Sequence, residues 1–153
     1  MTIRAWRIVR RNHAASAFDG EAAKNAGGRW NSPGSAVVYT ASSLPLAALE
    51  VLVHLPRESI LAKFVSIPVD FDEELVTELK ARLPPDWRDY PAPVSTMTIG
   101  DEWLRSKASP VLRVPSVIIP DESNFLLDPA HPDFAKLSIG TPRDFWFDRR
   151  LIK

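Results

Sequence analysis

Cysteine is absent from this chain of 153 residues. The absence excludes disulfide bonds, thiol nucleophiles and zinc sites built on thiolates. The three histidines, His13, His54 and His131, do not have the spacing of metal ligands, and no HExxH motif occurs. We therefore predict that the protein has no metal site.

Long apolar runs and an excess of one charge are also missing. No run approaches the roughly 18 apolar residues that cross a bilayer, and no signal-peptide core follows the basic N-terminus. The 19 basic and 19 acidic residues cancel, whereas nucleic-acid-binding proteins usually carry a basic excess. These absences predict a cytoplasmic protein that contacts neither a membrane nor nucleic acid directly.

The common nucleotide and hydrolase motifs do not occur either. The chain has no P-loop, no GxGxxG after a strand and no GxSxG. A nucleotide, if bound, is therefore held in another way.

What is present predicts a single α+β domain over residues 1–153. The 14 prolines are scattered, which favours fixed turns over a disordered linker. We expect about six strands and three or four short helices around a mixed, mostly antiparallel β-core. The predicted strands are 3–10, 36–41, 60–71, 110–120 and one or two in the C-terminal tail; the predicted helices are 42–55, 72–83 and 95–109.

The other segments are predicted to be irregular. Residues 11–28 form a loop or a loose helical turn, and residues 83–93 and 121–134 are rich in turns. Pro115 interrupts the strand at 110–120, which is typical of an edge strand or a bulge.

The stretch GGRWNSPGSAVVYTA at 27–41 contains two candidate site residues. Gly27 and Gly28 permit a positive φ and a close approach of the backbone to a ligand. Arg29 after such a turn suits bidentate binding of phosphate, although a solvated arginine beside a plain turn gives the same pattern. Tyr39 is either a core residue with a satisfied hydroxyl or an aromatic platform for a planar ring.

Three further polar residues lie in apolar surroundings. Glu50 occurs within LPLAALEVLVHL, where it lies either at a helix margin or in a pocket. Ser116 follows Pro115 in an apolar strand and either faces a ligand or bonds to the backbone of a bulge. Asn124 in DESNFLLDP is predicted to be a turn residue.

Four motifs in order make the chain resemble the RES domain, which is named for its arginine, glutamate and serine. The resemblance covers nearly the whole chain, and Asp128 departs from the asparagine expected there. The four motifs are GGRWNSPG (27–34), VVYTASSLPLAALEVLVH (37–54), VPSVIIPDESNFLLDPAHPDF (114–134) and FWFDRR (145–150).

The resemblance implies an ADP-ribosyltransferase-like fold and the toxin of a bacterial toxin–antitoxin pair that depletes NAD. It places Arg29, Glu50 and Ser116 among the catalytic residues, and Arg29, Tyr39, Ser116 and Asn124 among those that bind substrate. NAD is then a substrate, and no resident cofactor is expected. The implied partner is an Xre-type helix-turn-helix antitoxin. The toxin would contact DNA only through this antitoxin.

Three hypotheses about activity stay open at this point. The first is hydrolysis or phosphorolysis of the nicotinamide–ribose bond, and the second is transfer of ADP-ribose to a protein on the same fold. The third is a non-enzymatic interaction module. The aromatic tail serves either a homodimer or the core.

Overall fold

Two long strands form the centre of the fold in the computed structural model, which describes residues 1–79 and 82–152. β1 (Thr2–Arg10) and β3 (Phe64–Asp72) pair antiparallel along their whole length. The strands predicted at 3–10 and 60–71 are therefore confirmed.

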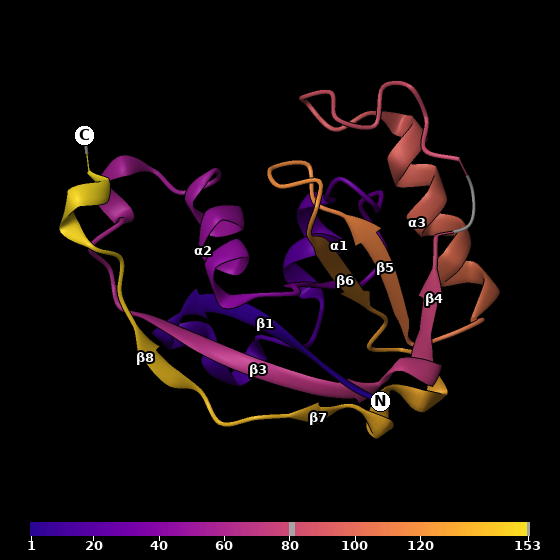
Figure 1. Cartoon of the computed structure of the whole chain (residues 1–153), viewed down its shortest axis with the longest axis horizontal. Helices are drawn as coiled ribbons and strands as arrows, with labels where there is room; N and C mark the ends of the chain where they lie inside the picture. The colour runs from indigo at the N-terminus through magenta and orange to yellow at the C-terminus, as the bar shows by residue number, and fades with distance from the viewer. Residues whose placement is uncertain (80–81, 153) are drawn as a thin grey trace.

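Shorter strands extend this pair into one curled sheet (Figure 1). The order across the sheet is β4-β5-β6-β2-β1-β3-β7, and β8 pairs with the opposite end of β3 from β7. Among the described pairs only β4 and β5 run parallel, so the predicted mixed, mostly antiparallel α+β fold is confirmed. The shorter strands are β2 (Val38–Ala41), β4 (Val76–Glu78), β5 (Val111–Pro115), β6 (Ser123–Leu127), β7 (Ser138–Ile139) and β8 (Arg143–Phe145).

The helices are short, as expected, and their ends follow from capping chemistry. The Ser43 hydroxyl accepts a hydrogen bond from the Leu46 N–H at 3.2 Å, and Pro45 stands in the first turn, where no N–H is needed. The helices predicted at 42–55 and 95–109 are both confirmed. The α-helices are α1 (Glu21–Ala26), α2 (Leu44–Leu52) and α3 (Val94–Ser106), and the 3-10 segments are η1 (Arg11–Ser16), η2 (Arg57–Ser59), η3 (Glu73–Leu75), η4 (Pro132–Lys136) and η5 (Arg149–Leu151).

The amphipathic helix predicted at 72–83 is wrong for the residues that the structure describes there. β3 continues to Asp72, whose carboxylate accepts from the Glu74 N–H at 2.9 Å and starts η3. β4 then pairs parallel with β5. Leu75 and Val76 pack on the core, so tertiary burial prevails over the helical spacing of the apolar residues. Residues 80–81 of the predicted helix lie outside the described residues.

The prediction that residues 121–134 are rich in turns missed a central strand. β6 lies between β5 and β2, and its last four residues are all buried. A strand buried on both faces shows no alternation of polar and apolar residues, which explains the miss. Pro115 is the last residue of β5, opposite Ser123, and β5 is not an edge strand. Its missing N–H is tolerated because the strand ends there.

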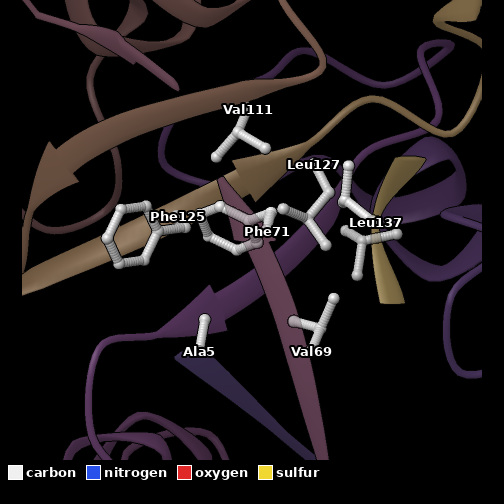
Figure 2. Close-up of a cluster of buried hydrophobic side chains, with 8 residues drawn as sticks. Ala5, Val69, Phe71, Val111, Phe125, Leu127 and Leu137 are labelled. Carbon is white, nitrogen blue, oxygen red and sulfur yellow. The ribbon is translucent and has the colours of Figure 1, made fainter. Parts of the chain in front are cut away.

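The core is built from side chains of the long strands and the β5–β6 pair. Phe71 of β3 and Phe125 of β6 meet edge to face, with ring centroids 5.3 Å apart. Figure 2 shows these rings with Val69, Val111 and Leu127 around them. Each such side chain stabilises the fold by about 1.5–3 kcal/mol when fully buried. Packing therefore fixes β6 and the start of its preceding turn, which carry two of the candidate site residues.

Candidate active site

Glu50 is the residue around which the candidate site assembles. Its Oε1 accepts a hydrogen bond from the Ser116 hydroxyl at 3.1 Å, and its Oε2 accepts from the Asn124 amide at 3.3 Å. The three residues come from α2, from the turn after β5 and from β6. The carboxylate is therefore fixed in position by donors on two other elements, which is typical of a group that acts chemically.

Ser116 is fully buried, and its hydrogen-bonding capacity is completely used. Its oxygen accepts from the backbone N–H groups of Ile118 at 3.1 Å and Ile119 at 3.2 Å. Since both lone pairs are taken, its single hydrogen is directed at Glu50. The structure shows the backbone contact of a turn and adds the contact with Glu50, whereas contact of Ser116 with a ligand stays a prediction.

Asn124 is a strand residue and not the turn residue expected from its neighbours. It lies on β6 opposite Ala41 of β2 and Val114 of β5. Its amide nitrogen is committed to Glu50, whereas its Oδ1 is buried without a hydrogen-bond partner among the described residues. An unpaired buried acceptor costs about 1–3 kcal/mol, so it points to a ligand that donates a hydrogen bond.

A small open pocket of about 60 Å³ lies beside this group. Its wall combines polar side chains with apolar ones from β1, β2 and α2. In Figure 1, α2 stands over the sheet next to β1 and beside the loop that joins β5 to β6. Among the lining residues are Trp6, Arg7, Tyr39, Glu50, Val51 and Asn124.

Tyr39 is one of the residues that line the pocket, but its hydroxyl has a structural task. It accepts from the Trp30 N–H at 3.1 Å and donates to Asn31 Oδ1 at 2.6 Å. Burial raises the pKa of Tyr39 far above its usual value, so the phenol stays neutral. The same contact explains Gly28, because a Cβ there would lie 2.6 Å from the Tyr39 hydroxyl oxygen. Gly27 supplies the positive φ of 73° that the turn requires.

Arg29 is not among the pocket-lining residues, although it is near enough to Glu50 to feel its charge. Its Nη1 donates to the carbonyl oxygens of Trp87 at 3.0 Å and Asp89 at 2.8 Å. Desolvation lowers its pKa, and the negative charge of Glu50 is the largest effect that opposes this shift. Arg29 and Glu50 therefore share one region of the molecule without forming an ion pair.

Arg7 was missed by the sequence analysis. It lines the pocket with Glu50, donates from Nε to the Ala17 carbonyl at 2.6 Å and from Nη1 to the Tyr39 carbonyl at 3.0 Å. Burial lowers its pKa, partly offset by Asp19. Its Nη2 has no partner in the part of the chain that the structure describes. The signal was an arginine between Trp6 and Ile8 in an apolar strand, obscured by two other arginines in TIRAWRIVR.

Asp128, the departure from the expected asparagine, is explained by a cation. It is 2% exposed, its Oδ2 accepts from Lys107 Nζ at 2.8 Å, and its Oδ1 accepts from the Ala130 N–H. Lys107 thus neutralises the negative charge of Asp128, which an asparagine would not carry. None of the residues that line the pocket takes part in this contact.

Comparison with known proteins identifies the family. A model of the RES domain matches residues 4–148. The chain belongs to the RES domain family. A Toxin Res from Yersinia enterocolitica is 44% identical over 148 residues, covering 95% of this chain and 97% of that protein. A Prs ADP-ribosylating toxin from Sphingobium sp. is 36% identical over 159 residues, covering 100% and 99%.

A solved structure confirms the fold of this RES domain. The crystal structure of the M. tuberculosis MbcT–MbcA toxin–antitoxin complex contains a chain that matches with a TM-score of 0.77 at 17% identity. The match covers 95% of this chain and 85% of that one. Within residues 1–79 and 82–152, no helix has the length and apolar character needed to cross a membrane.

Proposed function

We propose that this RES protein is the toxin of a toxin–antitoxin pair and consumes NAD in the cytoplasm by breaking its nicotinamide–ribose bond. The observation that carries the proposal is Glu50, held by Ser116 and Asn124 beside a pocket that Arg7 also lines. Membership in the RES family, with relatives named as toxins, supports it.

The chemistry needs only one carboxylate. Nicotinamide in NAD is already a cation, so when the bond from the ribose anomeric carbon to the ring nitrogen breaks, the electron pair neutralises the ring. The leaving group needs no proton, unlike the O-glycosides that usually require two carboxylates. Positive charge develops on the ribose, and the preorganised Glu50 carboxylate stabilises it. Water then adds to the anomeric carbon and releases a proton, or inorganic phosphate adds in its place.

The other residues position substrate. The unpaired Oδ1 of Asn124 accepts a hydrogen bond from a ribose hydroxyl or the nicotinamide carboxamide. Nη2 of Arg7 and the guanidinium of Arg29 bind phosphate or ribose oxygens. The Tyr39 ring stacks on nicotinamide, while its hydroxyl keeps the Arg29 turn in place. Ser116 acts through Glu50 and is a positioning residue.

A second candidate function is transfer of ADP-ribose to a protein. The Sphingobium relative, named as a Prs ADP-ribosylating toxin, favours this alternative because it matches the whole chain. Bond breaking and the role of Glu50 would be the same, and a protein nucleophile would replace water.

An Xre-type antitoxin is the partner that we propose for the toxin, with its C-terminal segment covering the Arg29–Glu50 region. Co-purified complex should then turn over NAD more slowly than free toxin.

The test is incubation of purified protein with NAD, with and without phosphate, and identification of the products by mass spectrometry. Free ADP-ribose indicates hydrolysis, its phosphate ester indicates phosphorolysis, and a stable adduct on a candidate protein indicates transfer. Glu50→Gln should lower kcat by about 100-fold or more. Glu58→Gln, at an exposed carboxylate on η2, is the matched control and should keep full activity. Undiminished turnover in Glu50→Gln would refute the role of Glu50, and undiminished toxicity without NAD turnover would leave the non-enzymatic hypothesis standing.

A further inference from the structure

The segment from Asp86 to Pro93, between β4 and α3, overhangs the candidate site. Its Trp87 and Asp89 carbonyls accept from Arg29, and its Arg88 Nη2 donates to the Val117 carbonyl at 3.1 Å. Val117 directly follows Ser116. Figure 1 shows the segment projecting across the top of the molecule above the loop between β5 and β6. It therefore joins the Arg29 turn to the turn that carries Ser116.

Tyr90 in this segment is presented to solvent on a backbone that is anchored on both sides. Its side chain is 85% exposed, the largest exposed fraction among the exposed apolar and aromatic residues of the described chain. Asp86 holds the start of the segment through the Ser95 hydroxyl at 2.6 Å, and Pro91 and Pro93 restrict the backbone on its other side. An aromatic ring on an anchored backbone loses little entropy when it binds.

The pocket is too small for a whole dinucleotide, so the rest of the substrate has to contact residues outside it. A pocket of about 60 Å³ admits only the reactive end of a dinucleotide, so the pyrophosphate and the adenylate lie outside it. Two cations are available for this contact: Arg88 lies in the segment, and Arg29 anchors it. The Arg88 guanidinium lies 5.9 Å from the centroid of the Trp87 ring. Arg29 contacts the carbonyl of Asp89, the residue before Tyr90, so a pyrophosphate bound by Arg29 would bring the attached nucleoside toward this part of the segment.

We propose that Tyr90 stacks on the adenine base and makes the site selective for a dinucleotide over a mononucleotide. The proposal rests on the proposed function and adds a residue that recognises the half of the substrate that does not react. Base–aromatic stacking tolerates an exposed aromatic platform, since the base supplies the other face. Tyr90 does not touch the reacting atoms and determines specificity only.

The test compares NAD with nicotinamide mononucleotide, which contains the same reacting bond and no adenylate. Tyr90→Ala should raise KM for NAD roughly tenfold, leave kcat unchanged and leave KM for the mononucleotide unchanged. Tyr90→Phe should keep the low KM for NAD because the ring remains. Trp146→Ala removes another exposed aromatic, 74% exposed between β8 and η5, and should change neither substrate.

An unchanged KM for NAD in Tyr90→Ala, or an equal change for both substrates, would overturn the adenine contact. A loss of protein modification with KM for NAD unchanged would also overturn it, because Tyr90 would then contact a protein acceptor. If wild-type protein cleaves neither substrate, the proposed function fails separately. Calorimetric titration with ADP-ribose still decides the inference in that case: affinity should fall roughly tenfold in Tyr90→Ala and hold in Tyr90→Phe.

Discussion

Ser116→Ala separates a positioning role in catalysis from a purely structural one. The substitution removes three hydrogen bonds of a fully buried hydroxyl: one donated to Glu50 and two accepted from the backbone at Ile118 and Ile119. At about 1 kcal/mol each, their loss lowers the free energy of unfolding by about 3 kcal/mol. For a domain of this size the melting temperature falls by about 6–12 °C.

The same change should lower kcat and spare KM. A hydrogen bond to a charged group contributes about 1.5–3 kcal/mol, so a mispositioned Glu50 should lower kcat about 10- to 100-fold. KM should stay near the wild-type value, since Ser116 has no free donor or acceptor for substrate. The assays are thermal unfolding and steady-state NAD turnover well below the melting temperature of the variant.

Ser109→Ala provides the matched control. Ser109 is also a buried serine with three hydrogen bonds, to Thr77, Trp103 and the Val111 carbonyl, and none of these partners lines the pocket. It should lose a similar amount of stability and keep kcat. Equal loss of kcat in both variants, or no loss in Ser116→Ala, would refute the positioning role.

Two further substitutions test how the Arg29 turn is held. Gly100→Ala would place a Cβ against the Trp30 carbonyl oxygen, so overpacking of about 1–3 kcal/mol should outweigh the gain in helix propensity of about 1 kcal/mol. The melting temperature and NAD turnover should both fall, whereas the control Thr98→Ala on the exposed face of α3 should leave both intact. A stabilised Gly100→Ala would show that the contact with Trp30 is not rigid. Tyr39→Phe leaves the Trp30 N–H and Asn31 Oδ1 without their partner and should cost about 1–3 kcal/mol at pH 7. Because burial raises the folded-state pKa of Tyr39 above the unfolded value of about 10, the stability tied to its neutral form is present below that pH and is lost as the pH rises beyond it. Urea unfolding at pH 7, 9 and 11 should therefore show a smaller alkaline loss in Tyr39→Phe than in wild type, and equal losses would contradict the burial argument.

Local chemistry in the sequence was enough for much of this protein. The strands at 3–10 and 60–71, and the helix that carries Glu50, follow from apolar pattern and capping, which act between near neighbours in the chain. The motifs were also sufficient for the family, since four of them in order carried the RES resemblance that the family model confirms. The absence of cysteine is likewise a property of the sequence alone.

Tertiary structure alone decided how the candidate residues divide their tasks. Asn124, which the resemblance had placed among the substrate-binding residues, reaches Glu50 because β6 pairs with β2 and β5. Arg7 entered the pocket because the register of β1 selects one of its three arginines, and Arg29 stayed outside the pocket lining, where the carbonyls of residues 87 and 89 occupy its guanidinium. These outcomes depend on contacts between residues far apart in the chain, which local spacing does not encode. The helix predicted at 72–83 was wrong for the same reason, since pairing with β5 outweighs a local helical pattern.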